Sequence, residues 1–325
     1  MNLYHYRSVK NALLEIENGT FRFSSPSDVN DPLDGYANVY WQGDTYAWEG
    51  LFRNYICSLY RVIELYLLAA DDTELKQSTV LKDINCYNDV PQGKVLENLS
   101  NAFLHDDDLQ KLILFYSTDR KTCSEEDLEC ILRVLHTKAV RMCLEALSSI
   151  GCIPYDEVEQ VCPQRDTSSA FLNELHRWHE DYPERSILPK INAVMRDAFE
   201  RHALANPVAD HSSLTDDESQ RVRWLWIYVD YPADYVKEIL RLIFPEGYMV
   251  CFSGRSDNSV MWGNYAEEHK GVCLVYNTHL HNSEEVISLQ RRSGCYTPHK
   301  VRSIQYTGTP VSRNFYESLG SCHYM

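Results

Sequence analysis

The stretch MVCFSGRSDNSVMWGNYAEEHKGVCLVY, residues 249–276, predicts a strand, a loop, a short helix and a second strand, in that order. Residues 249–253 and 272–276 are runs of β-forming side chains, and the segment between them begins with turn-forming glycine, serine, aspartate and asparagine. Residues 260–269 contain no proline and are followed by Lys270 and Gly271, a typical helix end. We expect the rest of the fold to be built around this unit.

The predicted helix at 260–269 places Trp262, Tyr265 and His269 on one face, because they are three and seven residues apart. Two aromatic rings and an imidazole beside a strand that ends at Ser253 are typical of the wall of a ligand pocket. A buried core stripe with a hydrogen-bonded histidine produces the same pattern. Both interpretations are open at this point.

The N-terminus supplies a second set of aromatic and polar side chains. Residues 2–7 predict a short strand with tyrosines on one face and Leu3, His5 and Arg7 on the other. Ser8 then predicts the N-cap of a helix that Gly19 ends. The apolar residues expected on the buried face of this helix are Val9, Leu13, Leu14 and Ile16.

Residues 20–24 predict another strand, which runs directly into a dense cluster of turn formers at 25–34. Polar loops at strand ends often contact ligands, so we expect this loop to lie over one. The same residues also serve as turn formers that bond to their own backbone, and the pattern does not separate the two roles. The polar candidates are Ser24, Ser25, Asn30, Asp31 and Asp34.

From about residue 45 to residue 242 nearly every segment predicts helix. Ser124 with three acidic residues after it predicts a capped start, and Gly151 predicts the end of that long helix. After residue 276, residues 279–298 are polar, 301–306 alternate as a further strand, and 310–325 show no clear pattern.

We therefore expect an α+β fold with a split β-sheet built from the N- and C-terminal segments and a large all-helical insertion between them. Residues 1–44 and 245–325 would form the β-rich core, and residues 45–244 the insertion. Neither end alone offers enough strands for an independent core, so the whole chain, 1–325, is predicted to be a single domain.

Charge and composition restrict the function. The 325 residues carry a formal net charge of −16, whereas residues 1–44 carry three basic and six acidic side chains and residues 251–325 carry seven and six. The acidic excess therefore lies in the helical middle, which disfavours nucleic acid as a partner there. No apolar run reaches membrane-spanning length, and eleven scattered cysteines fit a reducing compartment. We expect a cytoplasmic protein with no membrane contact and no bound metal.

Four stretches together resemble a bacterial family catalogued as domain of unknown function 2971. They are LYHYRS at 3–8, FSSPSDVNDPLD at 23–34, CFS at 251–253 and MWGNYAEEHKGV at 261–272. Their order and spacing are similar to the family pattern over nearly the whole chain, including a variable helical middle.

This family is remotely similar to the ADP-ribosyltransferase fold of bacterial toxins, and related genes resemble phage-defence and abortive-infection components. The resemblance implies NAD as a substrate and a nicotinamide pocket within a split sheet. The family pattern also implies a lysine, then a tryptophan followed by Glu-x-Glu-x-Arg, after residues 306–310. This chain departs from the pattern there, which puts the catalytic glutamate in doubt.

Cleavage of the nicotinamide–ribose bond passes through an oxocarbenium-like state that a carboxylate stabilises, as in glycoside cleavage. The nicotinamide needs an aromatic wall and polar partners for its amide, and a phosphate suits a bidentate arginine. On this hypothesis the catalytic residues are His5, Asp31 and His269. The residues expected to bind the nucleotide are Tyr4, Tyr6, Arg7, Ser24, Ser25, Asn30, Asp34, Ser253, Trp262 and Tyr265.

Two other classes of function are open. The chain fits a non-catalytic recognition or neutralising module of a defence pair, in which the acidic helical region binds a protein partner. It also fits a hydrolase that uses a metal held by Asp31, Asp34 and His269 or a nucleophile at Ser253 or Cys251. The latter signals are weak, because the residues around Ser253 lack the first glycine of a nucleophile elbow.

Overall fold

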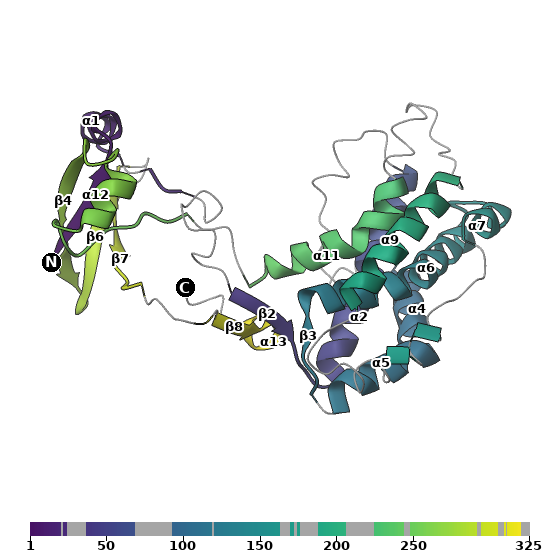
Figure 1. Cartoon of the computed structure of the whole chain (residues 1–325). Coiled ribbons are helices and arrows are strands. Elements are labelled where there is room, and N and C mark those ends of the chain that lie inside the picture. Colours follow the sequence, from purple (N-terminus) through teal and green to yellow (C-terminus); the bar gives the residue numbers. More distant parts are fainter. Residues whose placement is uncertain are drawn as a thin grey trace. The chain divides into compact units, whose positions relative to one another are not determined.

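The computed structural model describes residues 1–20, 22–24, 37–68, 93–118, 120–162, 170–171, 174–175, 188–205, 224–243, 248–290, 294–304, 309 and 311–319. Helices and short strands both occur, which confirms the predicted α+β class (Figure 1). The chain divides into two compact units. Unit 1 consists of Met1–Ala37 and Glu246–Val311, and unit 2 consists of Asn38–Pro245 and Ser312–Met325.

These units follow the predicted contrast between β-rich ends and a helical middle, with one difference. The last segment, Ser312–Met325, belongs to the helical unit 2 and not to the β-rich unit 1. The prediction that the ends and the middle form a single domain stays a prediction.

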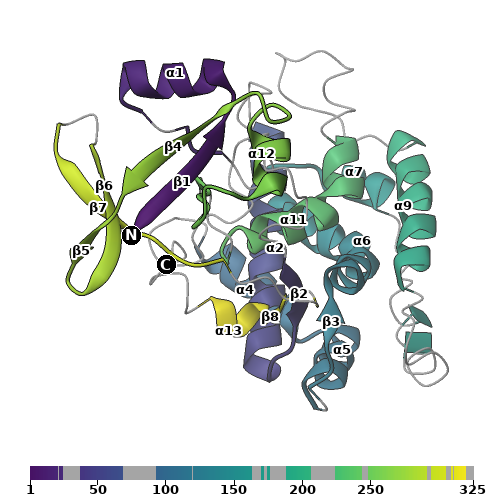
Figure 2. The same cartoon turned by 60° about the vertical axis from the view of Figure 1, so that its left-hand side comes forward.

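In unit 1, the predicted pairing of the two chain ends is present. Strand β1 (Asn2–Arg7) pairs antiparallel with strand β4 (Val272–Asn277), from Asn2 opposite Asn277 to Arg7 opposite Val272. Helix α1 (Val9–Asn18) follows β1 and contacts both strands (Figure 2). The Ser8 hydroxyl accepts the N–H of Asn11, and Gly19, at φ 59°, ends the helix as expected.

The predicted strands at 20–24 and 249–253 are wrong in extent. Among the described residues each makes only isolated bridges: Ser24 pairs with Met249, and Ser253 pairs with Tyr4. At each bridge two backbone hydrogen bonds of 2.8–2.9 Å are exchanged, and the ladder then stops. β1 therefore pairs with β4 along its whole length, and Tyr4 of β1 also forms a single backbone bridge to Ser253.

Residues 279–298, which were expected only to be polar, form most of a three-stranded antiparallel sheet. Its strands are β5 (His279–His281), β6 (Glu284–Gln290) and β7 (Tyr296–Lys300), in the order β5-β6-β7. Asn282 and Ser283, both at positive φ, make a two-residue hairpin turn. The sheet is largely exposed, so no apolar alternation marks it in the sequence. The predicted strand at 301–306 is absent over 301–304, and its remaining residues lie outside the described part of the chain.

Unit 2 is helical over most of its described length, as predicted. A small sheet of order β3-β2-β8 accompanies the helices. The helices are α2 (Thr45–Leu68), α4 (Gly93–Leu104), α5 (Asp107–Thr118), α6 (Glu125–Ser149), α7 (Tyr155–Val161), α9 (Leu188–Ala205), the π-helix η3 (Trp226–Asp230), α11 (Tyr231–Leu240) and α13 (Phe315–Ser318); the strands are β2 (Ala37–Trp41), β3 (Cys123–Ser124) and β8 (Val311–Asn314).

Helix α6 runs through the core of unit 2. Its predicted cap is confirmed as a reciprocal capping box, in which Ser124 and Asp127 each accept the other's backbone N–H. Gly151, at φ 82°, follows the helix end. Because α6 is buried on several sides, its hydrophobic residues do not form a single stripe.

The C-terminal segment, for which the sequence showed no pattern, packs onto β2. Phe315 is buried and its ring stacks on Trp41 at a centroid distance of 5.3 Å. Asn314 donates its side-chain N–H to the carbonyl of Gln42 at 2.8 Å. A Cβ at Gly43 would lie 2.7 Å from the Cβ of Ala47, so a glycine is needed for the chain to pass here.

Unit 1 buries few apolar side chains. Among its described residues only Leu3, Tyr6, Ala12, Ala266 and Val286 are buried hydrophobics. The prediction that the apolar residues of α1 are buried is wrong. Val9, Leu13 and Ile16 are 43%, 52% and 64% exposed, and Leu14 is exposed as well. The helix instead packs through Ala12 and Glu15, because Glu15 pairs with side chains of β1.

Candidate functional site

In unit 1 the two sequence-distant motifs meet beside β1. Helix α12 (Ser259–Tyr265) contacts the strand, and the ring of Trp262 lies edge-on to that of Tyr6 at 5.2 Å. The Tyr6 hydroxyl donates to the carbonyl of Arg255 at 2.7 Å. The fold therefore brings β1, residues 253–258 and α12 together, as the separation of the motifs suggested.

Residues 253–258 form a polar loop that is fixed at several points. The Ser253 backbone pairs with Tyr4, and the Trp262 indole N–H donates to the carbonyl of Ser256 at 2.9 Å. Asn258 caps α12 by accepting the N–H groups of the first two residues after Ser259. A loop held in this way is arranged before any ligand binds.

The loop presents Arg255, which is not among the site residues predicted from the sequence. Its side chain is 74% exposed and donates to both carboxylate oxygens of Asp257, at 2.9 and 3.1 Å. These hydrogen bonds from Arg255 lower the pKa of the Asp257 carboxyl. In the sequence, Arg255 lies in a loop of glycine, serine, aspartate and asparagine between a predicted strand and a helix with aromatic residues. That position could have identified it as a site residue.

The helix predicted for 260–269 ends earlier, at Tyr265. Glu267, Glu268 and His269 follow with φ of 51°, 54° and 68°, a left-handed turn without glycine. The backbone N–H of Glu268 donates to the carbonyl of Gly263, as in a Schellman motif, and that of His269 donates to Trp262. These bonds satisfy the last carbonyls of the helix and reverse the chain.

This turn, and not helical periodicity, places His269. A Cβ at Gly263 would lie 3.7 Å from Nε2 of His269, so the imidazole lies over that glycine. Tyr265 and His269 are exposed, and Trp262 is half-buried. The expectation that one helix face carries all three side chains is therefore wrong. That Trp262, Tyr265 and His269 line one cavity with His5 and Asn30 stays a prediction.

Glu267 occupies the position after the helix where glycine is preferred. We expect Glu267→Gly to raise the free energy of unfolding by about 0.5–1 kcal/mol, because glycine adopts the left-handed conformation without strain. Urea denaturation followed by circular dichroism measures the change. Glu17→Gly within α1 is the control and is expected to destabilise by about 1 kcal/mol. A loss of stability in Glu267→Gly would contradict the strain argument.

The opposite face of β1 carries a buried polar cluster around Glu15. Arg7 donates from Nε and Nη2 to Oε1 of Glu15, both at 2.7 Å, and the carboxylate side chain is 7% exposed. Nδ1 of His5 lies 3.4 Å from Oε2, and the Tyr276 hydroxyl donates to Oε2 at 3.5 Å. Burial, with a further contribution from the Arg7 charge, lowers the pKa of His5 to about 4, so its imidazole is neutral at pH 7.

These contacts give His5 and Arg7 a role in building unit 1. The Arg7 guanidinium is bound to Glu15, and the His5 ring packs against Phe252 at a centroid distance of 5.2 Å. Glu15, which holds both residues, was missed. Its only sequence signal is that it lies three residues after Ala12, on the same helix face.

The remaining predicted site residues divide into two groups. Tyr4 is half-buried and bridges to Ser253, while Ser24 bridges to Met249. The other predicted loop residues lie outside the described part of the chain: Ser25, Asn30, Asp31 and Asp34.

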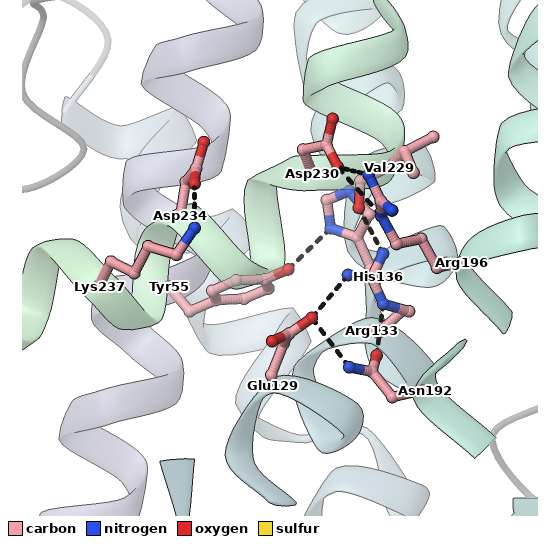
Figure 3. A network of polar contacts seen from close by, with 10 residues as sticks. All are labelled: Tyr55, Glu129, Arg133, His136, Asn192, Arg196, Val229, Asp230, Asp234 and Lys237. Atoms are coloured by element: carbon pink, nitrogen blue, oxygen red, sulfur yellow. Dashed lines mark hydrogen bonds and ion pairs between the residues drawn. The ribbon is translucent and has the colours of Figure 1, made fainter. Parts of the chain in front are cut away.

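Unit 2 contains a second polar cluster, between α6 and the π-helix η3 (Figure 3). Arg133 of α6 is fully buried; Nε donates to Asn192 at 2.6 Å, Nη2 to Glu129 at 2.9 Å and Nη1 to the carbonyl of Val229. On the same helix, His136 is also fully buried.

The hydrogen bonds of His136 define its tautomer. Nε2 lies 2.8 Å from the carbonyl of Ile227, which can only accept, so Nε2 carries the proton. Nδ1 therefore accepts from the Tyr55 hydroxyl at 2.7 Å. Burial lowers the pKa of His136 to about 3, which keeps the ring neutral.

This cluster stabilises the π-helix. Widening a helix to the π form displaces carbonyls from the α-helical hydrogen-bond pattern, and His136 and Arg133 satisfy those of Ile227 and Val229. The donors are buried and paired with the protein itself, so the cluster is structural. The polar loop of unit 1 is the candidate site.

No protein-family model matches this sequence, and no curated protein or solved structure matches it either. The similarity to domain of unknown function 2971 therefore stays a prediction. Within the described ranges, no helix combines the length and the apolar character that crossing a membrane requires.

Proposed function

We propose that the chain binds NAD through unit 1 and releases nicotinamide from it, as an ADP-ribosyltransferase-like or NAD-cleaving effector of a bacterial defence system. One observation supports this most directly. β1, the loop at 253–258 and α12 come together from opposite ends of the chain and present aromatic rings beside an exposed arginine.

The groups at this surface suit a dinucleotide. The rings of Tyr4, Trp262 and Tyr265 offer stacking faces, and the Ser253 hydroxyl offers a hydrogen bond. The forked guanidinium of Arg255 matches a pyrophosphate. Its present partner, Asp257, is equally exposed, and exposed ion pairs are weak, so an anionic ligand can displace that carboxylate.

From the sequence, His5 was expected to be catalytic and Arg7 to bind the nucleotide, but in this proposal both have a positioning role. Because both are bound to Glu15 on the other face of β1, we assign them the role of positioning the strand that carries Tyr4 and Tyr6. The carboxylate that stabilises the oxocarbenium-like state is expected at Asp31 or Asp34, on the sequence argument. His269 is exposed beside α12 and is the expected proton carrier.

Calorimetry with NAD and chromatographic detection of free nicotinamide test this proposal. Arg255→Gln is expected to weaken NAD binding about 10- to 100-fold, since a charge-assisted hydrogen bond contributes about 1.5–3 kcal/mol. Asp31→Asn is expected to keep binding and lose nicotinamide release. Arg241→Gln, which removes an equally exposed arginine paired with Glu238, is the matched control and should bind like wild type. Unchanged binding in Arg255→Gln would reject the site.

Charge favours a second candidate, a binding module for a basic protein. Unit 2 contains 22 of the 31 basic and 36 of the 47 acidic side chains, a formal charge of −14, against −2 for unit 1. A chain that neither binds nor cleaves NAD, yet forms a complex that salt weakens, would support this alternative.

A further inference from the structure

Helix α1 exposes an apolar stripe. Val9, Leu13 and Ile16 are four and seven residues apart, so they lie along one side of the helix, and each is at least 43% exposed. The helix contacts β1 and β4 through a different side, that of Ala12 and Glu15. Among the described residues of unit 1, these three belong to the large hydrophobic side chains that are exposed and not buried.

The charged residues beside the stripe can pair with the same two residues of a second copy. Lys10 and Glu17 are both exposed and lie seven residues apart, almost two turns, so they occupy the same flank of the stripe. Leu13 lies midway between them. When two such helices pack antiparallel, equivalent flanks face each other, so Lys10 of each copy meets Glu17 of the other. In a parallel two-fold pair the equivalent flanks lie on opposite sides of the interface, so the Lys10–Glu17 pairs do not form.

We propose that α1 is a self-association surface, on which a second copy of this chain docks antiparallel about a two-fold axis at Leu13. The interface is isologous, with the apolar stripe at its centre and two equivalent Lys10–Glu17 pairs at its rim. The distribution of charge favours this location, because contact through unit 2 would bring together two bodies of formal charge −14.

The size of the surface sets the expected affinity. A helix of 10 residues is about 15 Å long, which places the interface at the small end of specific ones. We therefore expect a reversible dimer with a dissociation constant in the micromolar range, an affinity well below that of an obligate assembly.

Sedimentation of the full chain over a range of concentrations measures the dimer dissociation constant. Lys10→Glu and Glu17→Lys are each expected to raise it about tenfold, because each creates like-charge pairs, and the double exchange is expected to restore it. Leu13→Glu is expected to abolish the dimer. Lys94→Glu and Glu97→Lys on α4, also exposed, are the matched controls and should leave the constant unchanged.

A chain that stays monomeric at 100 μM and above would overturn the proposal. So would a double exchange that fails to restore association, since that would rule out the antiparallel pairing. If the wild type is monomeric and Leu13→Glu lowers the melting temperature, the stripe is covered within the chain, which equally rejects self-association. Circular dichroism of each variant confirms that the comparison is between folded proteins.

Discussion

Replacing Arg133 by methionine is expected to lower the free energy of unfolding by about 3–5 kcal/mol, the usual cost of removing one partner of a buried charged pair. Methionine keeps the apolar stem of the side chain and removes its donors. The carbonyl of Val229 then loses its hydrogen bond from Arg133, and Asn192 and Glu129 lose their bonds to the guanidinium while keeping the 2.8 Å bond between them. Urea denaturation monitored by the helical circular dichroism signal measures the loss.

Arg196→Met is the control, because Arg196 of α9 also binds a residue of the π-helix η3. Arg196 contacts Asp230 at the end of η3, but its side chain is 54% exposed, so its removal is expected to cost less than about 1 kcal/mol. Equal losses in the two variants would show that the buried hydrogen bonds of Arg133 do not hold the π-helix.

Replacing Phe315 by alanine is expected to destabilise unit 2 by about 3–5 kcal/mol, as for other buried phenylalanines. The ring fills the space beside Trp41, and its loss leaves a cavity between α13 and β2. The same denaturation experiment applies, with limited proteolysis as a second measurement. The terminal segment of the variant should be cleaved faster than that of the wild type.

Leu319→Ala tests whether the effect is specific to the buried ring. Leu319 directly follows α13 and is 39% exposed, so we expect a change within about 1 kcal/mol. If Phe315→Ala is as mild as this control, the C-terminal segment does not contribute to the core of unit 2.

Local signals in the sequence predicted local structure well. Ser8 and Gly19 bound α1, and Ser124 with Asp127 starts α6, because caps depend only on neighbouring backbone groups. The pairing of β1 with β4 agrees with the prediction that strands from both ends of the chain meet in a sheet. Such features can be predicted without knowing which face of a helix or strand is buried.

Burial was harder to predict. The apolar positions of α1 suggested a buried stripe, but the ion pair between Glu15 and Arg7 turns another side of the helix toward the strands. The same limitation hid the sheet of β5, β6 and β7, whose exposed strands carry no apolar alternation. A π-helix has no periodic signal of its own, so η3 could not be anticipated.

For the candidate site, the sequence predicted the meeting of motifs but not the direction of each side chain. Tyr6 and Trp262 do contact each other across the chain. Arg7, expected on a phosphate, binds Glu15, and the exposed arginine is Arg255. Which of the two arginines is buried against a carboxylate and which is exposed depends on where Glu15 lies in the fold.

The pairing of β1 with β4 also affects the order in which the chain folds during synthesis. Leu3 pairs with Tyr276, so nearly the whole chain must be synthesised before the first strand finds its partner. At about 5–20 residues per second on the ribosome, β1 waits roughly 15–55 s. Helices α2 to α11 emerge during that interval and consist mainly of local contacts, which form quickly. The helical unit is therefore expected to fold first, and the strand that begins the chain is among the last to be paired.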